Sequence, residues 1–174
     1  VHSLDKMAWV MGDVPPLSVT AIGGRQAREG AETGNIYDHF GATFEYAGGV
    51  RGFHMSRQIA NCSNDNSDTL FGTKGIGRVE SGGQTLTISG ERPWSYEGEG
   101  NDMYQTEHDE LFAAIRKGEP VNDGLWMARS TMLAIMARMA AYTGQTLTWE
   151  QALASTERLG PATYAFGPCA LEPV

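Results

Sequence analysis

The 174-residue sequence lacks several features that would each point to a class of protein. No apolar run approaches the roughly 20 residues that span a bilayer, so we expect no membrane segment. The 13 lysines and arginines are scattered and the formal net charge is −8, which argues against a nucleic-acid partner, because phosphate binding needs clustered basic side chains. The two cysteines, Cys62 and Cys169, are too few for a disulfide framework or a zinc site, and we expect free thiols.

The motifs of several enzyme classes are also missing. The chain has no P-loop, no H-E-x-x-H and no G-x-S-x-G motif. Residues 72–77 come nearest to a dinucleotide-binding G-x-G-x-x-G, but the spacing is wrong and no helix follows. We interpret these glycines as a tight turn and expect no cofactor-binding residue in this chain. The histidines lack the spacing of a metal site, and we expect none; they are His2, His39, His54 and His108.

The hydrophobic pattern predicts strands first and helices afterwards, which indicates an α+β domain. An amphipathic helix at the start precedes the predicted strands, which are 17–22, 37–47, 50–60, 69–72, 75–80 and 84–89. Predicted helices follow, and they begin near Asp102, Leu125 and Thr148. Gly82-Gly83 is a predicted hairpin turn between the last two strands.

One predicted hairpin is clearer than the rest of the sheet. Gly48-Gly49 is a two-residue turn signal between its strands. Such a turn pairs Phe44 with Phe53 on one face and Thr43 with His54 on the other. The first face would then be apolar and the second small and polar. We therefore expect a sheet covered by helices on one side, with its second side open to solvent or to another subunit.

The first residues carry the strongest candidate for chemistry. The chain begins without methionine, already inside the predicted helix, in which Leu4 and Ala8 form an apolar stripe and Gly12 is a natural stop. His2 and Asp5 are three residues apart, so they share one face of that helix and could do acid–base work together. The alternative is that Asp5 only stabilises the positive end of the helix dipole. We interpret the sequence as the second half of a two-domain enzyme.

Six segments, taken in order, resemble the C-terminal domain of the glucose–fructose oxidoreductase, inositol dehydrogenase and MocA (Gfo/Idh/MocA) family. They are residues 1–9, 23–25, 71–75, 104–108, 122–124 and 142–144. The resemblance extends over essentially the whole chain. It implies that residues 1–174 are a C-terminal substrate and oligomerisation domain, with a large open-faced, mostly antiparallel sheet and helices packed on one face. It also implies an N-terminal Rossmann domain, absent from this chain, that binds NAD or NADP.

The resemblance further implies a set of acid–base residues. In the family a lysine of the nucleotide domain acts with an aspartate and a histidine of the second domain. That histidine corresponds to His2, Asp5 occupies the matching acidic position, and the other two residues would lie upstream of Val1. A neutral imidazole suits this role because it can take a hydroxyl proton near pH 7. Weaker candidates for contacts with substrate hydroxyls, for which a structural role is equally open, are Arg25, Asp38, Arg57 and Asn122.

The expected function is the substrate-binding half of an NAD(P)-dependent oxidoreductase acting on a sugar, polyol or related hydroxy compound, inactive by itself. We also expect a homodimer or homotetramer formed through the open sheet face. Alternatives are an NAD-dependent glycoside hydrolase of the same family, a non-enzymatic domain that dimerises or binds a ligand through the sheet, and a metal-dependent isomerase or hydrolase. We expect a cytoplasmic protein, with periplasmic export left open because the N-terminal region is missing.

Overall fold

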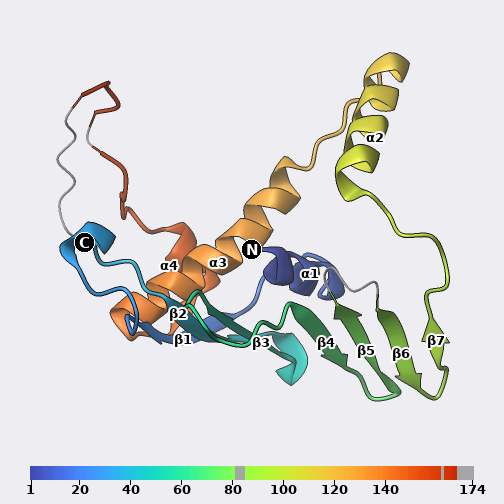
Figure 1. The fold of residues 1–174 in the computed structure, drawn as a ribbon, viewed down its shortest axis with the longest axis horizontal. Coiled ribbons are helices and arrows are strands. Elements are labelled where there is room, and N and C mark those ends of the chain that lie inside the picture. The colour runs from blue at the N-terminus through green and yellow to red at the C-terminus, as the bar shows by residue number, and fades with distance from the viewer. Residues whose placement is uncertain (81–84, 162, 168–174) are drawn as a thin grey trace. The chain divides into compact units, whose positions relative to one another are not determined.

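The computed structural model describes residues 1–80, 85–161 and 163–167 (Figure 1). These residues divide into two compact units, the first from Val1–Cys62 and Trp126–Val174, and the second from Ser63–Leu125. Each unit contains an antiparallel four-stranded sheet, so the predicted α+β class and open, mostly antiparallel sheet are confirmed. Within the described residues, no helix combines the length and apolarity needed to cross a bilayer.

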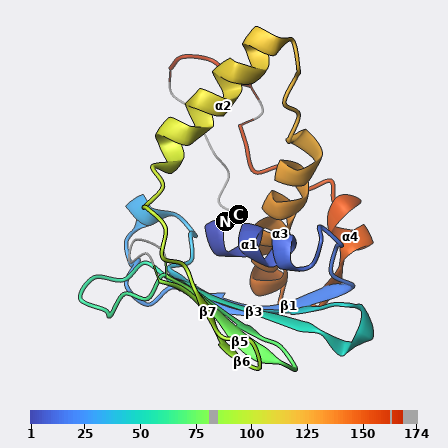
Figure 2. The same ribbon diagram turned by 90° about the vertical axis from the view of Figure 1, so that its right-hand side faces the viewer.

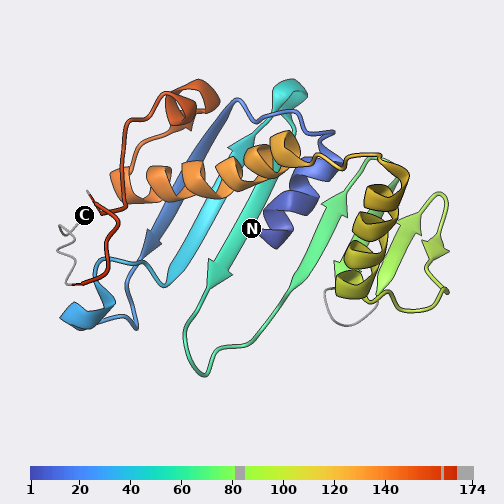
Figure 3. The same cartoon turned by 90° about the horizontal axis from the view of Figure 1, so that it is seen from above.

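The sheet of the first unit has the strand order β3-β2-β1-β8. Its strands are β1 (Ser18–Gly24), β2 (His39–Glu45), β3 (Arg51–Arg57) and β8 (Leu147–Thr148). Short 3₁₀ helices interrupt the connections at η1 (Ala31–Thr33) and η2 (Ala47–Gly49). Three α-helices of this unit lie on one side of the sheet, as Figures 2 and 3 show, and they are α1 (His2–Val10), α3 (Gly124–Thr143) and α4 (Trp149–Leu153).

The core lies between these helices and the covered face of the sheet. Its buried side chains come from α1, β1, β2, α3 and α4, and they are Leu4, Ala8, Val19, Ala21, Ala42, Phe44, Tyr46, Leu133, Met136, Ala137, Ala140 and Ala152. The predicted apolar stripe of the first helix is therefore confirmed. Helix α1 packs closely on Gly52 of β3, because the Met7 sulfur occupies the space that a Cβ atom at position 52 would fill.

The opposite face of this sheet is open. Ile22, Phe53 and Met55 lie there with 76%, 68% and 86% of their surface exposed. The side chain of Ile22 lies against Gly41, which separates it from Met55 in the same cross-strand row. These three side chains form an apolar patch, which we call the open-face patch.

The predicted register of the β2–β3 hairpin is wrong by one residue. Phe44 pairs with Gly52 and Thr43 pairs with Phe53. The loop holds three residues rather than two, because the amide of Tyr46 donates to the carbonyl of Val50 and residues 47–49 form η2. A one-residue shift moves every side chain of β3 to the other face, and for this reason Phe53 and Met55 lie on the open side.

The second unit contains the sheet β4-β5-β6-β7 and helix α2. Its elements are β4 (Ser67–Phe71), β5 (Gly75–Glu80), β6 (Leu86–Gly90), β7 (Trp94–Ser95) and α2 (Met103–Lys117). The predicted start of α2 is confirmed, since the Asp102 carboxylate accepts from the amides of Tyr104 and Gln105 at 3.1 and 3.2 Å. The predicted Gly82-Gly83 turn and Cys169 lie outside the described residues, whereas Cys62 is a free, half-buried thiol.

The predicted inner position of the α2 stripe is not observed. Tyr104, Leu111, Phe112 and Ile115 are 43–68% exposed, and His108 is exposed beside them. The imidazole Nδ1 of His108 donates to the Tyr104 carbonyl at 2.7 Å instead of packing in a core. The 3.6-residue periodicity correctly predicts the helix, but the described part of the second unit leaves its apolar stripe uncovered.

Candidate functional site

The two strongest candidates, His2 and Asp5, lie on the first turns of α1. Burial of Leu4 and Ala8 fixes which side of the helix faces the sheet. His2 lies on the opposite side, and Asp5 lies on the flank between His2 and the buried side. His2 is exposed and Asp5 is half-buried. The structure therefore presents an imidazole and a carboxylate on neighbouring positions of one helix face. An exposed imidazole can exchange a proton with a bound hydroxyl compound.

An aromatic pair lies further along the same helix. The rings of Trp9 in α1 and Trp126 in α3 are 5.4 Å apart between centroids and tilted by 36°. Trp9 is 64% exposed. The indole N–H of Trp126 is buried and has no hydrogen-bond partner among the described residues, so Trp126 packs through its ring. The sequence analysis does not single out Trp9, although its spacing of seven from His2 places it on the same helix face.

Asp38 is buried at the start of β2 and holds the loop that follows β1. One carboxylate oxygen, Oδ2, accepts from three consecutive backbone amides at 2.7, 2.7 and 3.0 Å, those of Gln26, Ala27 and Arg28. Its other oxygen, Oδ1, lies 2.8 Å from Nδ1 of His39. Burial by itself would raise the pKa of Asp38, but the hydrogen bonds from Ala27, His39, Arg28 and Gln26 outweigh burial and hold this pKa far below its usual range.

Arg25 is exposed and also serves this loop. Its Nε donates to the carbonyl of Arg28 at 2.7 Å, and its Nη2 lies 3.3 Å from the hydroxyl of Thr33. Arg25 and Asp38 therefore bind the same loop, one through its carbonyls and the other through its amides. Both are positioned as structural residues, which was the alternative left open by the sequence.

The structure brings three of the four weaker candidates to one end of the first sheet. Arg25 follows β1, Asp38 precedes β2, and Arg57 ends β3 opposite His39 in the ladder. Asn122 belongs to the second unit, where its side chain accepts from the amide of Gly124 at 3.2 Å at the beginning of α3. None of these four is on α1, which carries His2 and Asp5.

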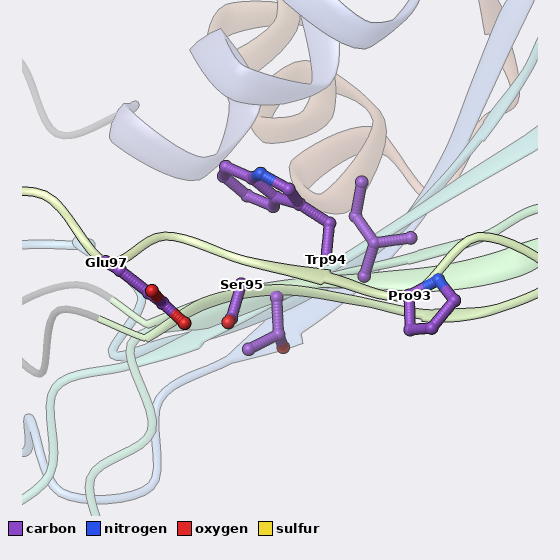
Figure 4. Close-up of a pocket in the computed structure, with 6 residues that line it drawn as sticks. Pro93, Trp94, Ser95 and Glu97 are labelled. Atoms are coloured by element: carbon purple, nitrogen blue, oxygen red, sulfur yellow. The ribbon is translucent and has the colours of Figure 1, made fainter.

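A shallow depression at the edge of the second sheet offers no comparable arrangement. Residues of β6, β7 and the connection after them line it, and they are Thr87, Ile88, Pro93, Trp94, Ser95 and Glu97. Figure 4 shows the Trp94 indole on one side of the strand and the Ser95 and Glu97 side chains on the other. The ladder agrees, because Thr87 pairs with Ser95 and Ile88 with Trp94 on opposite faces. Among the described residues, no three side chains of His, Cys, Asp or Glu are grouped to hold a metal ion.

Comparison with known families identifies the first part of the chain. Residues 1–78, which include α1 and the β1–β2–β3 sheet, match the family described as GFO/IDH/MocA C-terminal domain. Over these residues the chain is similar to that family. The resemblance expected from the sequence is thereby confirmed. No curated protein matches the chain.

Solved structures share the fold over most of the chain. UDP-N-acetylglucosamine 3-dehydrogenase from Acidithiobacillus ferrooxidans is 20% identical over 82% of this chain and 45% of its own, with a TM-score of 0.69. Aldose-aldose oxidoreductase from Caulobacter crescentus is 21% identical over 84% and 45%, with a TM-score of 0.69. The WlbA dehydrogenase from Bordetella pertussis, solved with NADH and UDP-GlcNAcA, is 20% identical over 84% and 42%, with a TM-score of 0.60. The chain spans less than half the length of each of these proteins.

Proposed function

We propose that this chain is the substrate-binding and oligomerisation domain of an NAD(P)-dependent oxidoreductase acting on a sugar, polyol or related hydroxy compound. The carrying observation is that the family match begins on the helix that presents His2 and Asp5 together. The structural relatives named above are a dehydrogenase of a sugar nucleotide, an aldose oxidoreductase and a dehydrogenase solved with NADH. These relatives support the reaction class, and the substrate of this protein is our inference.

The cofactor would be held by another domain. The Gly72–Gly77 segment of this chain contains the turn between β4 and β5, and no helix N-terminus is there to bind a pyrophosphate. This segment therefore does not fit a pyrophosphate site. In the proposal, a Rossmann domain binds NAD or NADP, and the nicotinamide accepts the hydride when bound.

The contribution of this chain is proton transfer. The neutral imidazole of His2 would accept the proton of the substrate hydroxyl while the carbonyl forms, and would donate it in the reverse reaction. Asp5, one turn along α1, would orient the imidazole or bind a neighbouring hydroxyl. His2 is suited to proton transfer because its side chain is exposed. The packing of Met7 on Gly52 holds the helix that carries His2 in place.

The open-face patch supports self-association as the second part of the proposal. Ile22, Phe53 and Met55 are apolar and exposed, and the Arg51–Glu45 ion pair at 3.0 Å lies on the same sheet face. Exposed apolar patches with a polar rim are typical of protein interfaces. We propose that a second copy covers this patch in a homodimer or homotetramer.

The test uses the natural gene product with its nucleotide-binding domain. NAD and NADP reduction is measured with glucose, myo-inositol and UDP-N-acetylglucosamine, for the natural protein, His2→Ala and the control His108→Ala. His2→Ala should lower kcat by roughly 10²–10⁴, as expected for loss of an acid–base group, while His108→Ala, an exposed imidazole on α2, should not. Unchanged turnover in His2→Ala would remove this residue from the mechanism. The natural protein is also incubated with a glycoside, and release of an unoxidised sugar there would instead favour the hydrolase alternative.

A further inference from the structure

Trp9 is a large aromatic side chain that the first unit leaves mostly exposed. It belongs to a helix that packs on a sheet, yet 64% of its surface is exposed, whereas Leu4 and Ala8 of the same helix are buried. A fully buried aromatic residue stabilises a fold by removing its ring from water, and Trp9 does this only in small part. Its exposure therefore calls for an explanation other than the core of this unit.

The helical geometry places Trp9 in line with the candidate acid–base pair. At 3.6 residues per turn, Trp9 lies within about 20° of His2 around the helix axis and about 10 Å further along it. Asp5 lies between them along the axis and about 60° from His2 around it. Because the Cα–Cβ bonds of a helix tilt toward its N-terminus, the Trp9 side chain starts back toward the Asp5 turn. One helix face thus carries an imidazole, a carboxylate and an indole over two turns.

Trp126 of the neighbouring helix α3 packs against the indole ring of Trp9. The two rings are 5.4 Å apart between centroids, which is contact distance for a tilted aromatic pair. This contact limits the rotamers open to Trp9 while most of its surface stays accessible. A ring that is held in place and exposed has little conformational entropy left to lose when a ligand packs on it.

We propose that Trp9 is the platform on which the ring of a cyclic substrate packs beside His2 and Asp5, an inference that rests on the proposed function. Sugar and cyclitol rings carry C–H groups with partial positive charge on their faces, and the face of an indole is negative. A span of about 10 Å along α1 leaves room for one such ring between the imidazole and the indole. An open-chain polyol has no flat C–H face, and it also loses more torsional freedom on binding. Trp9 therefore selects ring-form sugars and cyclitols over open-chain polyols.

The experiment compares Trp9→Ala and Trp9→Phe with Val10→Ala in the natural full-length protein. Val10 is a matched control because it is exposed on the same helix but lies about 100° around the axis from Trp9. Oxidation of myo-inositol and glucose is measured against oxidation of sorbitol, the open-chain probe. Trp9→Ala should raise KM for the ring substrates about tenfold, the loss expected for one aromatic contact, with kcat within about threefold. Its KM for sorbitol and for the dinucleotide should stay unchanged, and Trp9→Phe should retain most of the ring preference.

The outcomes separate this inference from the function on which it rests. If His2→Ala loses activity while Trp9→Ala keeps its KM for ring substrates, the platform is wrong and the proposed function stands. An equal rise in KM for sorbitol, or a rise in KM for the dinucleotide, also overturns the platform, because Trp9 would then contact another domain. A fall in melting temperature in Trp9→Ala with unchanged kinetics would assign Trp9 a structural role and overturn it too. If the natural protein oxidises none of the probes, both proposals fail together.

Discussion

Two tyrosines of the first unit give opposite predictions for the same substitution. The Tyr46 hydroxyl is buried and has no hydrogen-bond partner among the described residues. The Tyr142 hydroxyl donates to the Asn35 carbonyl at 2.9 Å and accepts from the Tyr37 amide at 3.0 Å. An unsatisfied buried polar group costs about 1–3 kcal/mol. Tyr46→Phe should therefore raise the free energy of unfolding by about 1 kcal/mol once the lost packing of the oxygen is counted. Tyr142→Phe should lower it by about 1–3 kcal/mol, because the Tyr37 amide loses its acceptor.

Urea unfolding followed by circular dichroism measures both changes. For a chain of this length, 1 kcal/mol corresponds to a shift in melting temperature of about 2–4 °C. Burial also raises the pKa of Tyr46 to about 12. The unfolded chain ionises at Tyr46 near the ordinary pKa of about 10, so the free energy of unfolding is unaffected by this group below pH 10 and falls as the pH rises from about 10 to 12. Tyr46→Phe should lack this loss. Destabilisation by Tyr46→Phe as large as that by Tyr142→Phe would refute the reasoning, since the Tyr46 hydroxyl would then have a partner.

The remaining predictions concern the packing of α1 on β3, the β1–β2 loop and the open face of the first sheet. Gly52→Val should destabilise the protein by about 1 kcal/mol, measured by urea unfolding, because the flexible end of the Met7 side chain must move to make room; unchanged stability would contradict this contact. Asp38→Asn should speed hydrogen exchange of the amides at residues 26–28, which the carboxylate binds; equal exchange in both proteins would show that the loop holds itself. Met55→Glu should lower the mass found by analytical ultracentrifugation, whereas an unchanged assembly would exclude this face as an interface.

Local sequence signals were sufficient wherever one segment decides the outcome. The buried stripe of Leu4 and Ala8 follows from helical spacing alone. Thr148 and Gln151 form the reciprocal capping box expected at the last helix, with hydrogen bonds of 3.2 and 2.8 Å. The order of strands and helices, and hence the α+β class, depends on such local patterns and was predictable for this reason.

Features that depend on a partner segment were not predictable in the same way. Two glycines at 48 and 49 fit a two-residue or a three-residue loop equally well, and only the hydrogen bond from Tyr46 to Val50 selects the second. The register of the whole hairpin depends on that choice. The α2 helix gives a similar case, because periodicity reveals an apolar stripe but not which surface covers it.

The candidate site also contains features that local sequence predicts and features that depend on distant segments. His2 and Asp5 are close in sequence, so their shared helix face could be predicted from spacing. For Asp38 the sequence left both a substrate contact and a structural role open. One of its oxygens accepts from three amides that lie 10–12 residues earlier, and a single residue type carries no signal of such contacts. Trp9 could have been found, since it follows Asp5 by four residues on the exposed side of the helix.

Helix α1 joins the fold to the proposed chemistry. Leu4 and Ala8 fix its rotation about its own axis, and contact of Met7 with Gly52 fixes its position on β3. The orientation of His2 and Trp9 follows from these packing contacts, because both side chains are attached to the same rigid helix. A small misplacement of a catalytic group is enough to lower a rate strongly. Gly52→Val should therefore reduce the activity of the full-length protein at temperatures where it is still folded, although residue 52 does not contact the proposed substrate.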